Sequence, residues 1–185
     1  KEKPGLFLMD DICASGCVYA AIGATEIWAL PTTITGSIGV IIQGLNVSEF
    51  LNRHGIQDHS ITSGKHKALL SPTRPVNEES TKIVQGIVDS MYARFVSLIE
   101  QNRNLSMEAI KLFADGRIFT ADQAKEFQLI DEVGTYEAAL QRLQEMANTP
   151  SDVQIVRYKH QPTIYEFLQQ NLSGGSFEAE MVQYL

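Results

Sequence analysis

The sequence predicts a mixed α/β fold in one globular domain, and three observations carry this prediction. Short apolar runs alternate along the chain with segments in which apolar residues recur at helical spacing. The first such run, residues 6–9, leads through a small-residue turn directly into a helix-like segment. The 185 residues are 44% hydrophobic and 20% charged, which provides enough apolar side chains for a sizeable core.

Strands are expected where short runs of apolar or β-branched residues meet turn residues. Pro31 ends one such run, while Gly36 and Gly39 interrupt another, which predicts a loop followed by a buried strand. Residues 56–62 alternate in polarity, as in a half-exposed strand. The expected strands are residues 6–9, 26–30, the end of 32–42, 56–62, 130–134 and 153–158.

Helices are expected where apolar residues recur every three or four positions. Ser48 or Asn46 is the expected N-cap of one helix and Gly55 its C-cap, and Thr120 with Gln123 has the spacing of a capping box. The longest helix carries an apolar stripe of Ile83, Ile87, Val88, Met91, Phe95, Leu98 and Ile99. The expected helices run from Ser15 to about Gly23 and over residues 44–55, 77–101, 106–113, 120–127, 136–147 and 163–172.

Ser15 is the candidate nucleophile, because it stands where a turn of small residues opens into a helix. Backbone N–H groups and the positive end of the helix dipole lie beside a serine at such a position, and they stabilise an anion formed next to its hydroxyl. Serine is also a favoured N-cap residue. On position alone, both roles stay open.

Three motifs, in order, resemble those of the signal peptide peptidase A family, also called protease IV. The family's nucleophile motif D-x-x-A-S-G-G-Y corresponds to residues 11–18, and its T-I-T-G-S-I-G-V stretch to residues 33–40. Its S-G-x-x-K segment, leading to S-P, corresponds to residues 63–67 and 71–72. A looser similarity continues to about Gly134. The resemblance implies a ClpP/crotonase-like fold of repeated ββα units and a Ser-Lys dyad peptidase.

The resemblance also implies a role for each site residue. Ser15 is the nucleophile, Lys67 is the general base 52 residues later, and Ser37 hydrogen-bonds the lysine amine and aims it. The backbone N–H of Gly16 is one oxyanion donor, and a glycine upstream of this chain supplies the other. Lys65 is then a surface neighbour of the base.

Two residues depart from the family's nucleophile motif. Cys17 replaces its second glycine and Val18 its aromatic residue. The nucleophile itself is unaffected, but the local shape of the substrate pocket is expected to differ from that of the family.

A His-Asp pair is the usual alternative base for a serine. The positions of the four histidines (His54, His59, His66 and His160) do little to favour a histidine base over lysine.

The resemblance implies a serine endopeptidase that cleaves remnant signal peptides or other unfolded peptides through an acyl-enzyme. Two alternatives stay open. One is a catalytically inactive family member acting as an assembly or scaffold subunit, which the departure at Cys17 suggests. The other is a crotonase relative that handles acyl-CoA, where a glycine N–H oxyanion hole works without a nucleophile.

Composition narrows the range of partners. A net charge of −7 argues against nucleic-acid binding, which needs a basic surface.

Cys13 and Cys17 are four residues apart, a spacing that favours two small buried thiols over a bridge. No His/Cys/Asp cluster has metal-ligand spacing, so neither a metal nor a cofactor is expected. No run of 18 apolar residues occurs, and the chain itself is expected to be soluble.

The character of the sequence changes after the pair Thr149-Pro150, which predicts a boundary between two parts of the chain. Residues 1–149 are expected to be the C-terminal part of the catalytic domain, and residues 150–185 an extension with a strand, a helix and a flexible tail. The tail, residues 177–185, is expected either to be a frayed end or to add a strand to a substrate cleft.

The resemblance places this chain within a larger protein. It implies that the chain is a C-terminal fragment preceded by N-terminal units and a membrane anchor. The full-length protein would then be membrane-associated, with its catalytic region on the extracytoplasmic side, and would form a ring-like homo-oligomer. The apolar stripe of the 77–101 helix offers a surface for such assembly.

Overall fold

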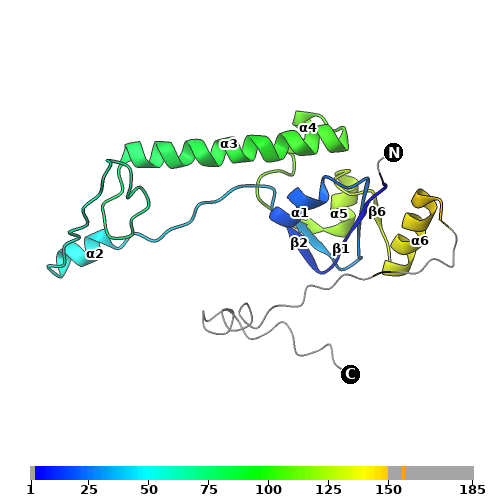
Figure 1. Ribbon diagram of the computed structural model, residues 1–185, viewed down its shortest axis with the longest axis horizontal. Coiled ribbons are helices and arrows are strands. Elements are labelled where there is room, and N and C mark those ends of the chain that lie inside the picture. Colours follow the sequence, from blue (N-terminus) through cyan, green and yellow to red (C-terminus); the bar gives the residue numbers. More distant parts are fainter. Residues whose placement is uncertain (1–2, 150–155, 157–185) are drawn as a thin grey trace, which may run out of the picture. The chain divides into compact units, whose positions relative to one another are not determined.

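The computed structural model describes residues 3–149 and Val156, and it confirms a mixed α/β chain. The chain divides into two compact units, residues 1–149 and 150–185, and the elements below all belong to the first. Its strands form two small sheets of three strands each, with α1 and α5 beside them (Figure 1). The strand, helix and tail expected after residue 150 lie outside the described residues, apart from Val156.

The first sheet is parallel and has the strand order β1-β3-β6. It consists of β1 (Leu6–Met9), β3 (Glu26–Ala29) and β6 (Glu132–Val133), all three of them predicted. Phe7 pairs with Ile27, and Ala29 pairs with Val133. Met9, Ile27 and Ala29 are buried, so this sheet forms part of the core.

The second sheet has the order β2-β4-β5 and carries the candidate nucleophile at one edge. Its strands are β2 (Ile12–Ala14), β4 (Ile34–Gly36) and β5 (Ile118–Thr120), with β2 and β4 parallel and β5 antiparallel to β4. The sequence did not indicate β2 or β5, because three residues are too few to show a period. The buried strand expected at the end of residues 32–42 was wrong: β4 ends at Gly36, and Ile41 is 78% exposed.

Six helices are described in residues 3–149, and each overlaps a predicted one. Asn77 caps α3 by accepting the Ser80 N–H at 2.8 Å, and Thr120 with Gln123 forms the predicted capping box. The helices are α1 (Gly16–Ala21), α2 (Ser48–Arg53), α3 (Glu78–Arg103), α4 (Met107–Lys111), α5 (Ala121–Glu126) and α6 (Tyr136–Ala147).

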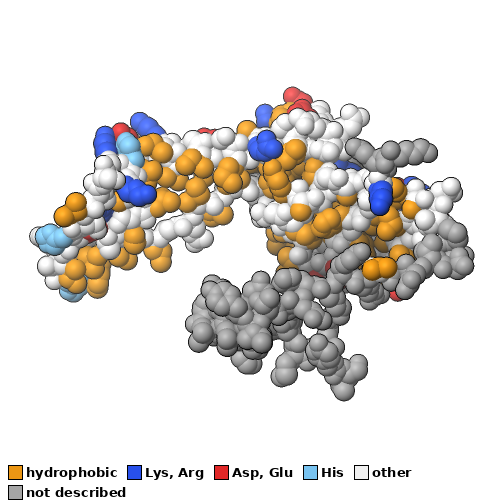
Figure 2. All heavy atoms as spheres, in the orientation of Figure 1, with side chains coloured by type: hydrophobic (Ala, Val, Ile, Leu, Met, Phe, Trp, Pro, Cys, Tyr) orange, Lys and Arg blue, Asp and Glu red, His pale blue; other side chains and the backbone are white. Residues whose placement is uncertain are grey.

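The apolar residues of helix α3 are buried only toward its C-terminal end. Phe95, Val96 and Ile99 are in the core, whereas Ile87 and Met91 are exposed. Figure 2 shows apolar side chains open to solvent along this part of the molecule. The stripe predicted as continuous therefore divides into a buried half and an open half.

The last residue of α3 ties the helix to the first sheet. Arg103 forms an ion pair with Asp131, 2.7 Å between Nη2 and Oδ1. Asp131 also accepts the backbone N–H of Ile27 in β3 at 2.7 Å. The carboxylate thus links the end of α3 to a core strand.

Residues 56–62 do not form the predicted strand. They lack regular structure, and Ile61 is fully exposed. Alternating polarity gives a strand only where a partner edge is available for backbone hydrogen bonds. Here the chain is organised instead by the carboxylate of Asp58, which accepts hydrogen bonds from Ser60, Thr73 and Arg74.

Candidate active site

Ser15 lies between β2 and α1 with an unusual backbone conformation. Its φ is 53° and its ψ is −111°, a combination sparsely populated by residues other than glycine. Its backbone N–H donates to the carbonyl oxygen of Gly36 at 2.8 Å. Ser15 occupies the N-cap position, but its side chain makes no capping hydrogen bond. The hydroxyl is therefore not engaged as an ordinary helix cap.

Ser37 directly follows β4, the strand next to β2, and lies at the same end of the sheet as Ser15. β2 and β4 are parallel and paired at Ala14 and Gly36, so the residues that follow them emerge side by side. The Ser37 N–H donates to the carbonyl of Arg117 at 2.7 Å, and its φ is also positive, at 51°. The parallel register thus brings the two serines together.

Gly36 is required by this geometry. Its φ is +90°, and a Cβ atom there would lie 2.6 Å from the Phe119 ring and 2.8 Å from the carbonyl oxygen of Arg117. A side chain at this position would push β4 away from β5 or shift the turn that carries Ser37. The glycine therefore helps to set the position of both serines.

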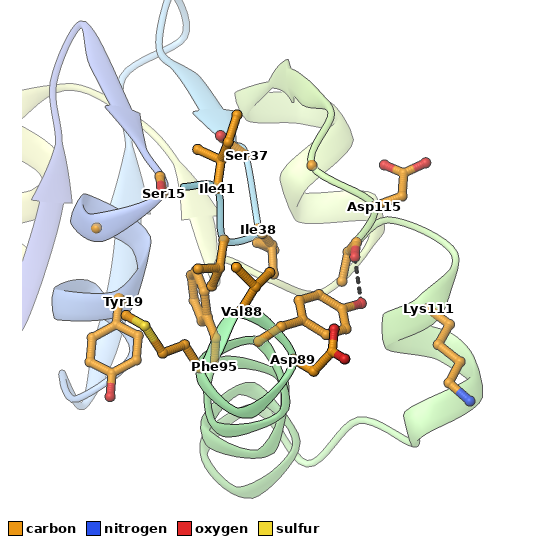
Figure 3. Close-up of a pocket in the computed structure, with 17 residues that line it drawn as sticks. Ser15, Tyr19, Ser37, Ile38, Ile41, Val88, Asp89, Phe95, Lys111 and Asp115 are labelled. Atoms are coloured by element: carbon orange, nitrogen blue, oxygen red, sulfur yellow. Dashed lines mark hydrogen bonds between the residues drawn. The ribbon is translucent and has the colours of Figure 1, made fainter. Parts of the chain in front are cut away.

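Ser15, Gly16 and Ser37 line one open pocket of about 1070 Å³. The helix α3 supplies an apolar wall of this pocket, formed by Val88, Met91 and Phe95. Figure 3 shows Val88 and Phe95 across the pocket from the two serines. Tyr92 also lines the pocket and donates its hydroxyl to the Ala114 carbonyl at 2.6 Å, the dashed bond in the figure. An apolar hollow beside a serine can take up an apolar side chain of a peptide.

Three charged residues also line the pocket, namely Asp89, Lys111 and Asp115. Figure 3 shows Lys111 directed away from the serines. The hydrogen-bonded guanidinium of Arg117 lowers the pKa of Asp115 to about 2. A carboxylate so weakly basic is a poor acceptor for a serine proton near neutral pH.

Lys67 does not line this pocket. It is exposed on the segment between α2 and α3, and its backbone N–H donates to the Gly64 carbonyl at 3.1 Å. Lys65 instead pairs with Glu79, 2.5 Å between Nζ and Oε2. None of His54, His59 and His66 lines the pocket either. The structure thus brings together Ser15, Gly16 and Ser37, and it leaves Lys67 apart from them.

Cys13 and Cys17 form a disulfide across the Ser15 turn, which corrects the prediction of two free thiols. A four-residue spacing is unfavourable for a bridge within one regular element. Here, however, Cys13 is in β2 and Cys17 in α1, and the sharp turn between them brings their Cα atoms to 5.1 Å. The sequence did not indicate β2. Once β2 is known, the sharp turn between β2 and α1 accounts for the short distance between the Cα atoms of Cys13 and Cys17.

The α3 wall of the pocket was also missed. Its residues belong to the predicted apolar stripe, and nothing in a helical period distinguishes a side chain that faces a cavity from one that faces the core. Among the described residues, no helix combines the length and the apolar character needed to cross a membrane.

Comparison with known proteins gives a family for this arrangement. Residues 1–149 match the model of "Peptidase family S49". The chain is 44% identical over 142 residues to "Putative protease slr0021" of Synechocystis sp., covering 77% of this chain and 51% of that protein. It is 41% identical over 150 residues to "Putative signal peptide peptidase SppA" of Enterococcus faecium (81% and 43% covered). It is 27% identical over 173 residues to "Protease 4" of Salmonella typhi (94% and 28% covered). The chain spans about half the length of the first two relatives, and it belongs to peptidase family S49.

Proposed function

We propose that the protein containing this chain is a serine endopeptidase whose nucleophile is Ser15. One observation carries the proposal. In a chain of a peptidase family, Ser15 sits at a strained strand-to-helix turn with its hydroxyl unused as a cap, beside an apolar pocket. Strained backbone of this kind concentrates at functional sites. The fold we propose for the catalytic domain is the ClpP/crotonase-like one, with residues 1–149 as its C-terminal part.

The proposed reaction begins with attack of the Ser15 Oγ on a peptide carbonyl carbon. The serine proton passes to the neutral amine of Lys67, and the carbonyl becomes a tetrahedral oxyanion. Collapse of this intermediate breaks the C–N bond, the lysine returns the proton to the leaving amine, and an acyl-enzyme remains. Water then attacks the ester by the same route, which releases the acid and restores Ser15.

Gly16 is suited to the role of oxyanion donor. As the first residue of α1, its N–H has no acceptor within the helix. A Cβ atom built on Gly16 would have no neighbour within 4 Å, so open space lies beside this backbone. A second donor is proposed from a segment upstream of this chain.

We propose that Lys67 reaches Ser15 from a neighbouring copy in a ring-like homo-oligomer. Lys67 lines no part of the Ser15 pocket within one chain, and the segment that carries it exposes Ile56, Ile61 and Leu70. Burial of such side chains between copies would favour assembly. In this arrangement Ser37, at the edge of the pocket, accepts a hydrogen bond from the incoming amine.

The proposed substrates are remnant signal peptides and other unfolded peptides. The apolar wall of the pocket suits small or apolar side chains at the cleavage site. Association of the full-length protein with a membrane, with the catalytic region on the extracytoplasmic side, is part of the same proposal.

Labelling with a fluorophosphonate tests the nucleophile, because only an activated serine reacts. We expect the full-length protein to be labelled at Ser15, and Ser15→Ala to lose both the label and peptide cleavage.

The base is tested by two lysine variants. Lys67→Ala should also lose cleavage, while the matched control Lys65→Ala should keep it, since the described partner of Lys65 is Glu79 in an exposed ion pair. No label on Ser15 would overturn the proposal. Inactivity of Lys65→Ala with an active Lys67→Ala would overturn the assignment of the base.

A further inference from the structure

The disulfide between Cys13 and Cys17 encloses the residue proposed as the nucleophile. Cys13 lies two residues before Ser15 and Cys17 two residues after it, so the bridge closes a ring of five residues with Ser15 at its centre. One sulfur is attached to β2 and the other to the first turn of α1. The crosslink therefore joins the two elements whose junction determines where the Ser15 hydroxyl points.

The two ends of the bridge are held differently. Cys13 is buried and pairs with Thr35, itself buried, in the middle of the β2–β4 ladder. Cys17 is half-buried on α1, a helix of six residues, and helices this short have little stability of their own. The sheet thus provides a fixed point, and the disulfide holds the start of the helix to it.

Ser15 itself needs such support. Its φ of 53° and ψ of −111° are unfavourable for a serine, and its backbone N–H has a single described partner, the Gly36 carbonyl at 2.8 Å. A backbone in a sparsely populated region persists only where its surroundings constrain it. The disulfide is a covalent constraint on this turn.

We propose that the Cys13–Cys17 disulfide is a redox-dependent positioning element that keeps Ser15 in its reactive geometry, so that reduction lowers the reactivity of this serine. The proposal rests on the proposed function of Ser15 as nucleophile. It also gives a role to Cys17 where the family motif has glycine.

Reduction of the disulfide requires an external dithiol and takes place in two thiol–disulfide exchange steps. A thiolate of the dithiol attacks the sulfur of Cys17, the more accessible of the two, and the sulfur of Cys13 leaves as a thiolate. The second thiol of the reductant then attacks the mixed disulfide and releases Cys17. In sum, two electrons and two protons pass to the protein, which gains two thiols, and the dithiol becomes a disulfide.

A local role is expected because the closed ring is short. In the chain-entropy model a bridge constrains the unfolded chain less as its loop shortens, so a five-residue ring contributes less to global stability than a longer one. Reduction should therefore act on the turn more than on the fold. This separates positioning of Ser15 from general stabilisation.

The test compares oxidised and dithiothreitol-reduced full-length protein, with the redox state followed by thiol titration. We expect the second-order rate constant for fluorophosphonate labelling of Ser15 to fall about tenfold or more on reduction, since a small misplacement of a reacting atom is costly. For a peptide substrate, kcat should fall by a similar factor while KM changes little. Reoxidation should restore both rates.

The variant Cys13→Ala/Cys17→Ala is the matched control. It should label slowly under both conditions and show no response to dithiothreitol, with a melting temperature close to that of the reduced wild type. Equal labelling of oxidised and reduced wild type would overturn this proposal and leave the nucleophile standing. No labelling of Ser15 in either state would overturn the proposed function and this inference with it.

Discussion

At the scale of single residues, the site depends on backbone conformations that few side chains tolerate. Ser15, Ser37 and Gly36 all have positive φ, and all three lie at the ends of β2 and β4. Gly36 is the most constrained of them, because Phe119 and the Arg117 carbonyl occupy the space of a Cβ atom. The candidate site thus rests on one glycine that contributes no functional group.

Gly36→Ala should destabilise the protein by about 1–3 kcal/mol or more, through the cost of a positive φ and the clash with Phe119. Urea unfolding measures this change. Gly86→Ala is the matched control: Gly86 lies inside α3 with no atom within 4 Å of a built Cβ, and alanine there should stabilise by about 0.5–1 kcal/mol. Equal stability of the two variants would show that the space around Gly36 is not constrained.

At the scale of elements, Asp58 organises the segment that carries Lys67. Its carboxylate accepts the Ser60 N–H at 2.7 Å and the Thr73 hydroxyl at 2.6 Å, and it pairs with Arg74 at 3.3 Å. These bonds join the two ends of residues 61–70, which have no helix or strand of their own. The Asp58 carboxylate therefore holds together a segment that has no backbone hydrogen-bond ladder.

This segment should loosen in acid. Hydrogen bonds from Ser60 and Thr73, with Arg74 nearby, hold the pKa of Asp58 well below its ordinary range. A carboxyl with a lowered pKa in the folded state stabilises that state above its unfolded pKa of about 3.9, and this stabilisation is lost as the pH falls further. Amide-exchange protection of Ser60, whose N–H donates to the Asp58 carboxylate, should therefore decrease below about pH 4 after correction for the intrinsic pH dependence.

Asp58→Ala, which removes both acceptor oxygens, should show the same loss of protection already at neutral pH. The amides of Val96 and Ile99, buried in α3, serve as the internal control and should stay protected in both proteins. Protection of the Ser60 amide that is unchanged in Asp58→Ala would contradict a role for the carboxylate.

Sequence patterns predicted those elements whose signals are local. The bounds of β1 and α6 are those predicted, and Thr120 with Gln123 forms the predicted capping box. The strands β2 and β5 were missed, because only pairing with β4 defines such short elements. For the site, the motifs singled out Ser15 and Ser37, which the structure places after the paired ends of β2 and β4. The disulfide and the α3 wall could not be predicted, because both depend on how separate elements come together.

At the scale of the whole molecule, a single chain exposes many large apolar side chains. Within residues 3–149, Leu45, Ile61 and Val76 are each more than two-thirds exposed, and the N-terminal half of α3 adds Ile87. These side chains are available for the assembly proposed above, in which Lys67 of one copy completes the Ser15 pocket of another.

Mixing two inactive variants tests this assembly. If Ser15 and Lys67 act from different copies, Ser15→Ala mixed with Lys67→Ala should recover about one quarter of wild-type peptidase activity at random exchange between subunits. The double variant Ser15→Ala/Lys67→Ala, mixed with either single variant, is the control and should stay inactive. Absence of recovery after verified subunit exchange would mean that both residues act within one chain.

The link from Arg103 through Asp131 to Ile27 has a consequence for the pocket's dimensions. It anchors α3, and with it one wall of the pocket, to the sheet of β1, β3 and β6, while Ser15 belongs to the sheet of β2, β4 and β5. Arg103 thus fixes the C-terminal end of α3 to one sheet, whereas the Ser15 turn follows β2 of the other sheet. A change of side-chain size on α3, at Met91 for example, adjusts the width of the cavity without disturbing the ladder that holds the serine.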